Sequence, residues 1–196
     1  ARIMGLRVFS ENDNDLTAII DAIIDSVYYA VEQGARVISV SLGLRTEYFA
    51  GDQFARFQAA VAYARANNAI VVAAAGNDGA GMNSYPALFP DAISVGALYR
   101  SNFNGNVLRD WYSNYGSQLD FMAPGTDILS TRAAISDTSG YPYFNGNVNY
   151  TKISGTSMAT PMVSGTIALL LSQNPLQSFD DIYRRLRFSA TEKGSS

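Results

Sequence analysis

Histidine and cysteine are both absent from the 196 residues of this sequence. Without cysteine there is no disulfide, no thiolate nucleophile and no cysteine-ligated metal, although this does not fix the compartment. Without histidine the chain cannot supply an imidazole base, a histidine metal ligand or a serine–histidine pair. Chemistry that needs an imidazole must therefore take it from outside these residues.

Charge and long apolar runs are also scarce. Charged residues make up 16% of the chain, against roughly 25% in an average soluble domain, and the formal net charge is −3. This balance argues against a surface that follows a phosphate backbone, so nucleic acid is not expected as a partner. The aliphatic run at 167–171 is far shorter than the ~20 residues that span a bilayer, so no membrane partner is expected either.

What the sequence does contain is an alternation of two apolar patterns. β-branched runs at 2–9, 37–42, 69–75 and 92–98 are interrupted by helical spacing at 16–33 and 53–67. A short strand at 119–123, a buried helix at 158–173 and an amphipathic helix at 179–186 are expected to follow. This order is typical of a three-layer α/β/α fold with a mainly parallel sheet. With 47% hydrophobic residues, the length suits one core.

The sharpest local feature is the segment GTSMATP at 155–161, which leads into the predicted buried helix. Ser157 fits an ordinary N-cap, and it equally fits a nucleophile at the positive end of a helix dipole. Pro161 is expected in the first turn, where a missing N–H costs little. Ala159 excludes the Gly-x-Ser-x-Gly elbow of lipases.

Two further segments end predicted strands. AAAGNDG at 73–79 fits a strand followed by a turn, and it also fits an amide, Asn77, placed at the carboxyl edge of a parallel sheet to donate to an oxyanion. SVSLG at 39–43 is by itself only a strand end with a glycine turn. No carboxylate is assigned a catalytic role, and Asp78 is interpreted as a turn residue.

Together these three segments resemble the subtilisin-like serine proteases, the subtilases. SYPA at 84–87, ISVGA at 93–97 and DFMAPG at 120–125 match the family in the same order. The resemblance implies a subtilisin-like fold and a serine endopeptidase that hydrolyses peptide bonds in peptides or proteins. It also implies secretion, and chemistry that requires no cofactor.

The resemblance implies roles residue by residue. Ser157 would be the acylated nucleophile, and Asn77 would bind the oxyanion together with the Ser157 backbone N–H. The substrate-binding walls and floor would be Ser41, Leu42 and Gly43; Ala74, Ala75 and Gly76; and Ser84, Tyr85 and Pro86. Such small walls favour a large apolar substrate side chain. Some relatives hold a cation weakly on backbone carbonyls, and the matching positions for structural calcium are Ala87, Phe89 and Ala92.

This sequence departs from the family at the other two triad positions. The segments that carry the family's Asp and His are not in it, so residues 1–196 are interpreted as the C-terminal part of a subtilase catalytic domain. The N-terminal strands, the Asp and the His would come from outside this chain, covalently or as a second chain. The chain alone is therefore expected to be inactive.

Two alternatives remain open at this point. A non-catalytic subtilase relative would keep the fold without an upstream base. A sedolisin-type Ser-Glu-Asp peptidase would need no histidine, but sedolisins place an Asp at the oxyanion position, where this chain has Asn77. A strongly acidic activity optimum would favour the second alternative.

In the subtilase sheet, the Asp-bearing strand lies between the strands that correspond to 2–9 and 37–42. The isolated chain would then have a gap in its sheet and unpaired backbone groups on both sides of it. We predict that the isolated 196-residue polypeptide does not fold stably. Thermal denaturation checks this, and a cooperative transition of the pure chain would contradict it.

Overall fold

The computed structural model describes residues 2–9, 15–132 and 144–191. Its helices are α1 (Leu16–Glu32), α2 (Gln53–Ala66), α3 (Thr156–Gln173) and α4 (Phe179–Ser189), with a short 3-10 helix η1 (Thr46–Tyr48). The central sheet contains β1 (Val37–Val40), β2 (Ile70–Ala74), β3 (Ala92–Arg100), β4 (Val107–Arg109) and β5 (Phe121–Pro124). A separate hairpin is formed by β6 (Ile128–Thr131) and β7 (Tyr150–Ile153).

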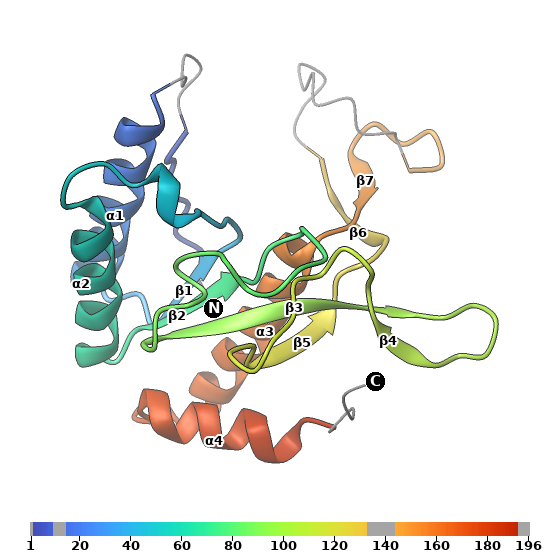
Figure 1. Cartoon of the computed structure of the whole chain (residues 1–196). Coiled ribbons are helices and arrows are strands. Elements are labelled where there is room, and N and C mark those ends of the chain that lie inside the picture. The colour runs from blue at the N-terminus through green and yellow to red at the C-terminus, as the bar shows by residue number, and fades with distance from the viewer. Residues whose placement is uncertain (1, 10–14, 133–143, 192–196) are drawn as a thin grey trace.

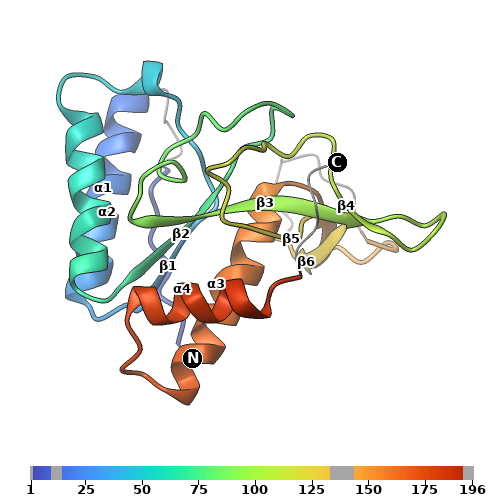
Figure 2. The ribbon, with the colours of Figure 1, turned by 60° about the horizontal axis from the view of Figure 1, so that its bottom comes forward.

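The central sheet is mainly parallel. β1 pairs with β2, β2 with β3 and β3 with β5, all in parallel, and β4 adds to β3 in the antiparallel direction. α1 and α2 lie together on one side of this sheet, and α3 and α4 lie on the other (Figures 1 and 2). The arrangement is the predicted three-layer α/β/α architecture.

The alternation of side chains along β2 shows why both faces of the sheet are covered. Val71 and Ala73 belong to the core cluster with α1 and α2, whereas Ile70 and Val72 belong to the cluster with α3 and α4. All five residues of β2 are buried. A strand buried on both faces is continuously apolar, which is the pattern of the sequence at this strand.

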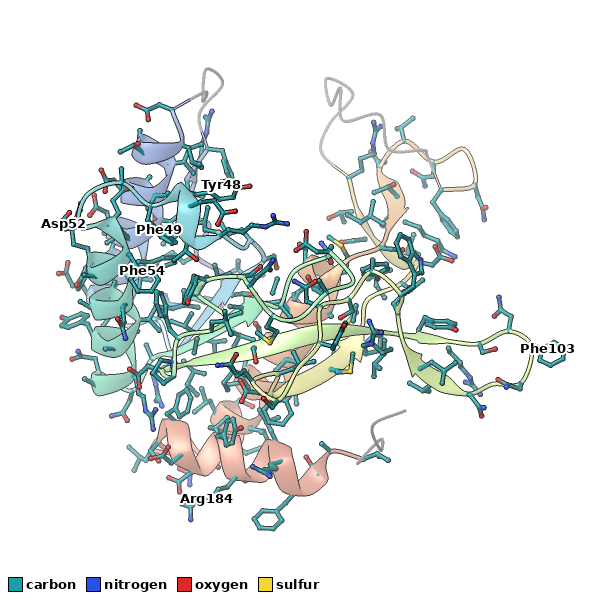
Figure 3. All side chains as sticks on the ribbon, viewed as in Figure 1. Tyr48, Phe49, Asp52, Phe54, Phe103 and Arg184 are labelled. Atoms are coloured by element: carbon teal, nitrogen blue, oxygen red, sulfur yellow. The ribbon has the colours of Figure 1, made fainter. Side chains whose placement is uncertain are left out.

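Aromatic rings support the segment that follows β1. Phe49 and Phe54, labelled in Figure 3, meet edge to face with centroids 5.4 Å apart, and Phe54 packs on Tyr85 at 4.9 Å. Backbone hydrogen bonds then join Leu44 and Tyr85 in both directions, at 2.9 and 2.8 Å. These contacts fix the 41–45 segment beside the 84–86 segment, and both border the site described below.

Most predicted elements are confirmed to within a few residues, including both helices on one side of the sheet and the helix predicted at 158–173 on the other. That helix was expected to be buried, but one face of it, with Met162 and Leu169, is exposed in this chain. The strand predicted at 2–9 is wrong, because these residues form no strand and Ile3 is almost fully exposed. An extended segment becomes a strand only when a neighbour accepts its hydrogen bonds. Among the described residues, segment 2–9 pairs with no strand, and β1 pairs only with β2, so the other edge of β1 is unpaired.

Three short strands, β4, β6 and β7, had no counterpart in the sequence prediction. They have three or four residues each, and their side chains are largely exposed, so they lack the apolar signal of the core strands. Of the helices in the described ranges, none is both long and apolar enough to cross a membrane.

The core around α3 yields a stability prediction. Ile167 is fully buried in the cluster beneath β2 and β3, whereas Leu169 on the same helix is 70% exposed. In the full-length protein, Ile167→Ala should lower the free energy of unfolding by about 2–5 kcal/mol, because the cavity cannot be refilled. Leu169→Ala should change it by about 0.5 kcal/mol or less. Denaturant unfolding compares the two, and equal losses would contradict the assigned core.

Candidate active site

A pocket of about 260 Å³ opens where the carboxyl ends of β1 and β2 meet the first turn of α3. Ligand sites of open parallel sheets lie at this edge. Its lining residues come from β2, α3, η1 and the loops that follow β1 and β2: Leu42, Gly43, Arg45, Tyr48, Ala74, Gly76, Asn77, Asp78, Ser84, Thr156 and Ser157. The two residues predicted to carry the chemistry, Asn77 and Ser157, therefore face the same space.

Ser157 is the second residue of α3, and Gly155 is its N-cap. Its hydroxyl donates to the backbone carbonyl of Ser41, with Oγ and O 3.0 Å apart. The hydroxyl is therefore not occupied in capping the helix, which removes the simpler of the two interpretations of the GTSMATP segment. The Ser157 hydroxyl lines the pocket and donates its hydrogen to the Ser41 carbonyl.

A second hydrogen bond runs the opposite way, from the Ser41 hydroxyl to the Ser157 carbonyl at 2.8 Å. Pro161 explains why that carbonyl accepts from another element. It is the sixth residue of α3, not a first-turn residue as the sequence suggested, and it has no N–H for the carbonyl four residues earlier. The Ser41 hydroxyl satisfies the acceptor that Pro161 leaves, and it joins β1 to the turn that carries Ser157.

The Asn77 side chain is oriented by Thr156. Its Oδ1 accepts from the Thr156 backbone N–H at 2.8 Å and from the Thr156 hydroxyl at 3.0 Å. A backbone N–H can only donate, so the amide oxygen must face Thr156 and the Nδ2 group must face elsewhere. The Thr156 hydroxyl also accepts from the Gly76 N–H at 3.3 Å, which ties the same contact to the end of β2.

Two N–H donors remain at the pocket. Within the described residues, no acceptor takes the Nδ2 hydrogens of Asn77 or the backbone N–H of Ser157. The Ser157 N–H is one of the four amides that a helix leaves without an intrahelical acceptor, and it lies at the positive end of the α3 dipole. Both donors favour negative charge developing beside the Ser157 hydroxyl.

An ion pair stands among the lining residues. Arg45 Nη2 and Asp78 Oδ1 are 2.6 Å apart, and both side chains are partly exposed, so the pair contributes little to folding stability. Hydrogen bonds from Asn114 and Arg45 hold the pKa of Asp78 below its ordinary range, while partial burial acts the other way. Hydrogen bonding and the charge of Asp78 raise the pKa of Arg45. The two side chains are therefore both charged at neutral pH and largely neutralise each other.

The structure brings most of the predicted substrate-binding residues to this pocket. Leu42 and Gly43 line one side, Ala74 and Gly76 another, and Ser84 a third. Ser41 contacts Ser157 directly. Ala75, Tyr85 and Pro86 are outside the lining set: the Ala75 carbonyl accepts from Asn114 at 3.0 Å, and Tyr85 bonds to Leu44 behind the wall.

Arg45, Tyr48, Asp78 and Thr156 line the pocket without having been assigned to it from the sequence. Asp78 and Thr156 are adjacent to the two predicted catalytic residues, and that adjacency was a usable signal. Arg45 follows Gly43 by two positions, but nothing local distinguishes it from a surface arginine. Neither does any local pattern mark Asn114, whose contacts are made across more than 30 residues of sequence.

The carbonyls expected to hold a cation lie in the segment before β3 and at the first residue of that strand. Ala87, Phe89 and Ala92 are buried there, and the Phe89 carbonyl already accepts from the Ala92 N–H at 3.1 Å. The parts of the chain described by the structure contain no cluster of three acidic side chains that could hold a metal. A cation bound here would therefore rely on backbone carbonyl oxygens. The Phe89 carbonyl oxygen already accepts one hydrogen bond and has a second lone pair available.

A model of the subtilase family (peptidase S8) matches this chain over residues 1–196. The chain belongs to the subtilase family. It is 35% identical to subtilisin Savinase of Lederbergia lenta over 177 residues, which cover 90% of this chain and 57% of that protein. It is 40% identical to thermitase of Thermoactinomyces vulgaris over 173 residues, which cover 88% of this chain and 52% of that protein.

Solved structures agree with the family. The prenylagaramide maturation protease PagA matches with a TM-score of 0.70 and 32% identity, over 93% of this chain and 62% of that one. A lanthipeptide protease matches with a TM-score of 0.76 over 97% of this chain and 63% of that one, and at 24% identity it supports the fold alone. This subtilase chain spans a little over half the length of these two curated relatives, subtilisin Savinase and thermitase.

The turn before Asn77 yields a prediction with an internal control. Gly76 has a φ of +103°, and a Cβ there would lie 2.4 Å from Asn114 Nδ2. In the full-length protein, Gly76→Ala should lower the free energy of unfolding by about 2–4 kcal/mol, from backbone strain and overpacking. Gly165→Ala, inside α3 with nothing within 4 Å of the added carbon, should raise it by about 0.5–1 kcal/mol. Denaturant unfolding distinguishes them, and a tolerated Gly76→Ala would count against this turn geometry.

Proposed function

We propose that the protein to which this chain belongs is a serine endopeptidase that forms its acyl-enzyme on Ser157. The observation that carries the proposal is the pair of donors at one pocket. The Asn77 amide and the Ser157 backbone N–H, each without an acceptor among the described residues, lie where a hydroxyl also faces the pocket. Family membership supports the same chemistry.

In the first step, Ser157 Oγ attacks the carbonyl carbon of a peptide bond and its proton passes to a base. The carbonyl oxygen gains the negative charge and accepts hydrogen bonds from Asn77 Nδ2 and the Ser157 N–H. The carbon–nitrogen bond then breaks, and the amine leaves with the proton from the base. Water, deprotonated by the same base, releases the acyl group and restores the Ser157 hydroxyl.

The base and the acid that orients it are proposed to be a His and an Asp from outside these 196 residues, because this sequence has no histidine. The present partner of the Ser157 hydroxyl, the Ser41 carbonyl, accepts a hydrogen bond but cannot take up a proton at neutral pH. Ser157 would have to turn from this carbonyl to the base. The chain alone is therefore proposed to be inactive.

The substrate is proposed to lie as an extended peptide along the end of β1, adding backbone hydrogen bonds to Ser41, Leu42 and Gly43. One substrate side chain would enter the pocket between Leu42, Ala74 and Gly76. Arg45 and Asp78 largely cancel each other's charge, so the pocket favours an uncharged, large apolar side chain over a charged one. Ala75, Tyr85 and Pro86 would support these walls from behind.

The free edge of β1 supports the proposal of a partner segment. We propose that an upstream segment of the same catalytic domain, covalent or separate, brings the Asp-bearing strand to this edge and the His to Ser157. The exposed 2–9 segment would then find the strand partner that it lacks among the described residues. From the family we also propose that the protein is secreted. We further propose that the carbonyls of Ala87, Phe89 and Ala92 hold a structural calcium ion.

Labelling with a fluorophosphonate tests the proposed nucleophile. The full-length protein should gain the mass of one adduct, because a serine activated by a base attacks phosphorus and stays bound to it. Intact-mass measurement reads out the adduct, and Ser157→Ala is the control that should gain none. An unlabelled full-length protein, correctly folded, would contradict the proposal and favour a non-catalytic relative.

A further inference from the structure

Asn114 has the most completely engaged polar side chain near the site, and no role has been given to it so far. It lies in the loop between β4 and β5 and is fully buried. Its Nδ2 donates to the Ala75 carbonyl at 3.0 Å, and its Oδ1 accepts from the backbone N–H groups of Asp78 and Ala80 at 2.9 and 3.3 Å. Both ends of one carboxamide are therefore bonded to the backbone of one loop.

These hydrogen bonds lie on both sides of Asn77 in the sequence. Ala75 precedes it and Asp78 follows it, while the Asn114 backbone N–H donates to the Gly76 carbonyl at 3.0 Å. The backbone on both sides of Asn77 is therefore held by Asn114, whereas the Asn77 side chain is held by Thr156. The backbone position of the donor depends on Asn114, and its side-chain direction depends on Thr156.

The fit between Asn114 and this loop is close. A Cβ on Gly76 would lie 2.4 Å from Asn114 Nδ2, so the loop passes the amide at a distance that only glycine allows. Asn114 Nδ2 also lies 3.3 Å from Asp78 Oδ2 and 3.2 Å from Asn83 Oδ1. A carboxylate at this position could not donate to the Ala75 carbonyl, and a hydrocarbon could make none of these bonds.

We propose that Asn114 is a positioning residue that sets the place of the Asn77 oxyanion donor. The proposal rests on the function proposed above, and it adds a residue that touches neither the substrate nor the reacting atoms. A hydrogen bond to a developing oxyanion is sensitive to displacements of the order of 1 Å. Replacing Asn114 by alanine removes the hydrogen bonds to Ala75 and Asp78 on either side of Asn77 and leaves the backbone bond to Gly76, so stabilisation of the transition state is weakened while the pocket wall formed by Leu42 and Gly43 remains.

A double-mutant cycle on the full-length protein tests this. The variants are Asn114→Ala, Asn77→Ala and both together, with kcat and KM measured on one peptide substrate. Loss of one oxyanion-hole donor from subtilisin lowers kcat by about 10²–10³-fold, which bounds the effect that a residue acting through Asn77 can have. Asn114→Ala should lower kcat by about 10–100-fold with KM changed less than about threefold.

The second half of the cycle separates positioning from a general loss of structure. When Asn77 is already alanine, adding Asn114→Ala should lower kcat by less than about threefold, because there is no donor left to misplace. An equal loss in both backgrounds, or no loss of kcat in the first, would overturn the proposal. Wild-type turnover that requires Ser157 is measured first, so that failure of the proposed function is recognised separately.

Gln177→Ala is the matched control. Gln177 is also a buried carboxamide, and its Nε2 donates to the Leu170 and Asn174 carbonyls at 3.1 Å, near the far end of α3 from Ser157. It should destabilise the protein without changing kcat. If Asn114→Ala does not fold, Asn114→Ser replaces it in the cycle, because its single hydroxyl oxygen cannot take the places of both Nδ2 and Oδ1 and adds no buried charge beside Asp78. Its kcat loss should likewise disappear when Asn77 is alanine, and a loss that persists would overturn the proposal.

Discussion

The paired hydrogen bonds from Thr156 to the amide oxygen of Asn77 join the end of β2 to the beginning of α3. Two segments separated by 79 positions in the sequence depend on this contact for their relative placement. Because the contact uses the side-chain oxygen of Asn77, the side-chain nitrogen of Asn77 points away from Thr156. The contact also takes up the Thr156 backbone N–H, the first of α3, and leaves the Ser157 backbone N–H without an acceptor among the described residues. The presence of two N–H donors at the pocket follows from this arrangement.

Around this contact, three parts of the structure hold the two segments that carry Asn77 and Ser157. The sheet holds the turn that carries Ser157 through Ser41, whose hydroxyl and carbonyl bond in opposite directions to the Ser157 carbonyl and hydroxyl. The loop after β4 holds the backbone beside Asn77 through a buried carboxamide. The core beneath the sheet holds α3 itself through fully buried side chains such as Ile167. A rigid site at the end of a helix thus relies on groups that are distant in sequence and local in space.

The predictability of each feature from the sequence reflects the range of its interactions. α1 and α2 were predictable because apolar residues recur every three or four positions, as Ile20 and Ile23 do in α1 and Phe57 and Val61 do in α2. β2 was predictable because a strand buried on both faces is apolar throughout. That Ser157 and Asn77 would lie at one pocket was predictable because each lies in a segment that resembles a subtilase motif. The segment 2–9 was mispredicted because a strand needs a neighbour. Pro161 was misplaced because the position of the N-cap was not readable from the sequence. Asn114 and Arg45 had no local signal at all, since their partners are more than 30 positions away.

The proline in α3 has a consequence for how the nucleophile is held. A helix normally closes its own hydrogen bonds, and its first turn then moves with the helix alone. Because Pro161 leaves the Ser157 carbonyl open to Ser41, the first turn of α3 is anchored to β1 as well. β1 is also an edge strand, which pairs only with β2 among the described residues. An element that pairs with this edge would therefore also restrain the turn that carries Ser157, because Ser41 links the two.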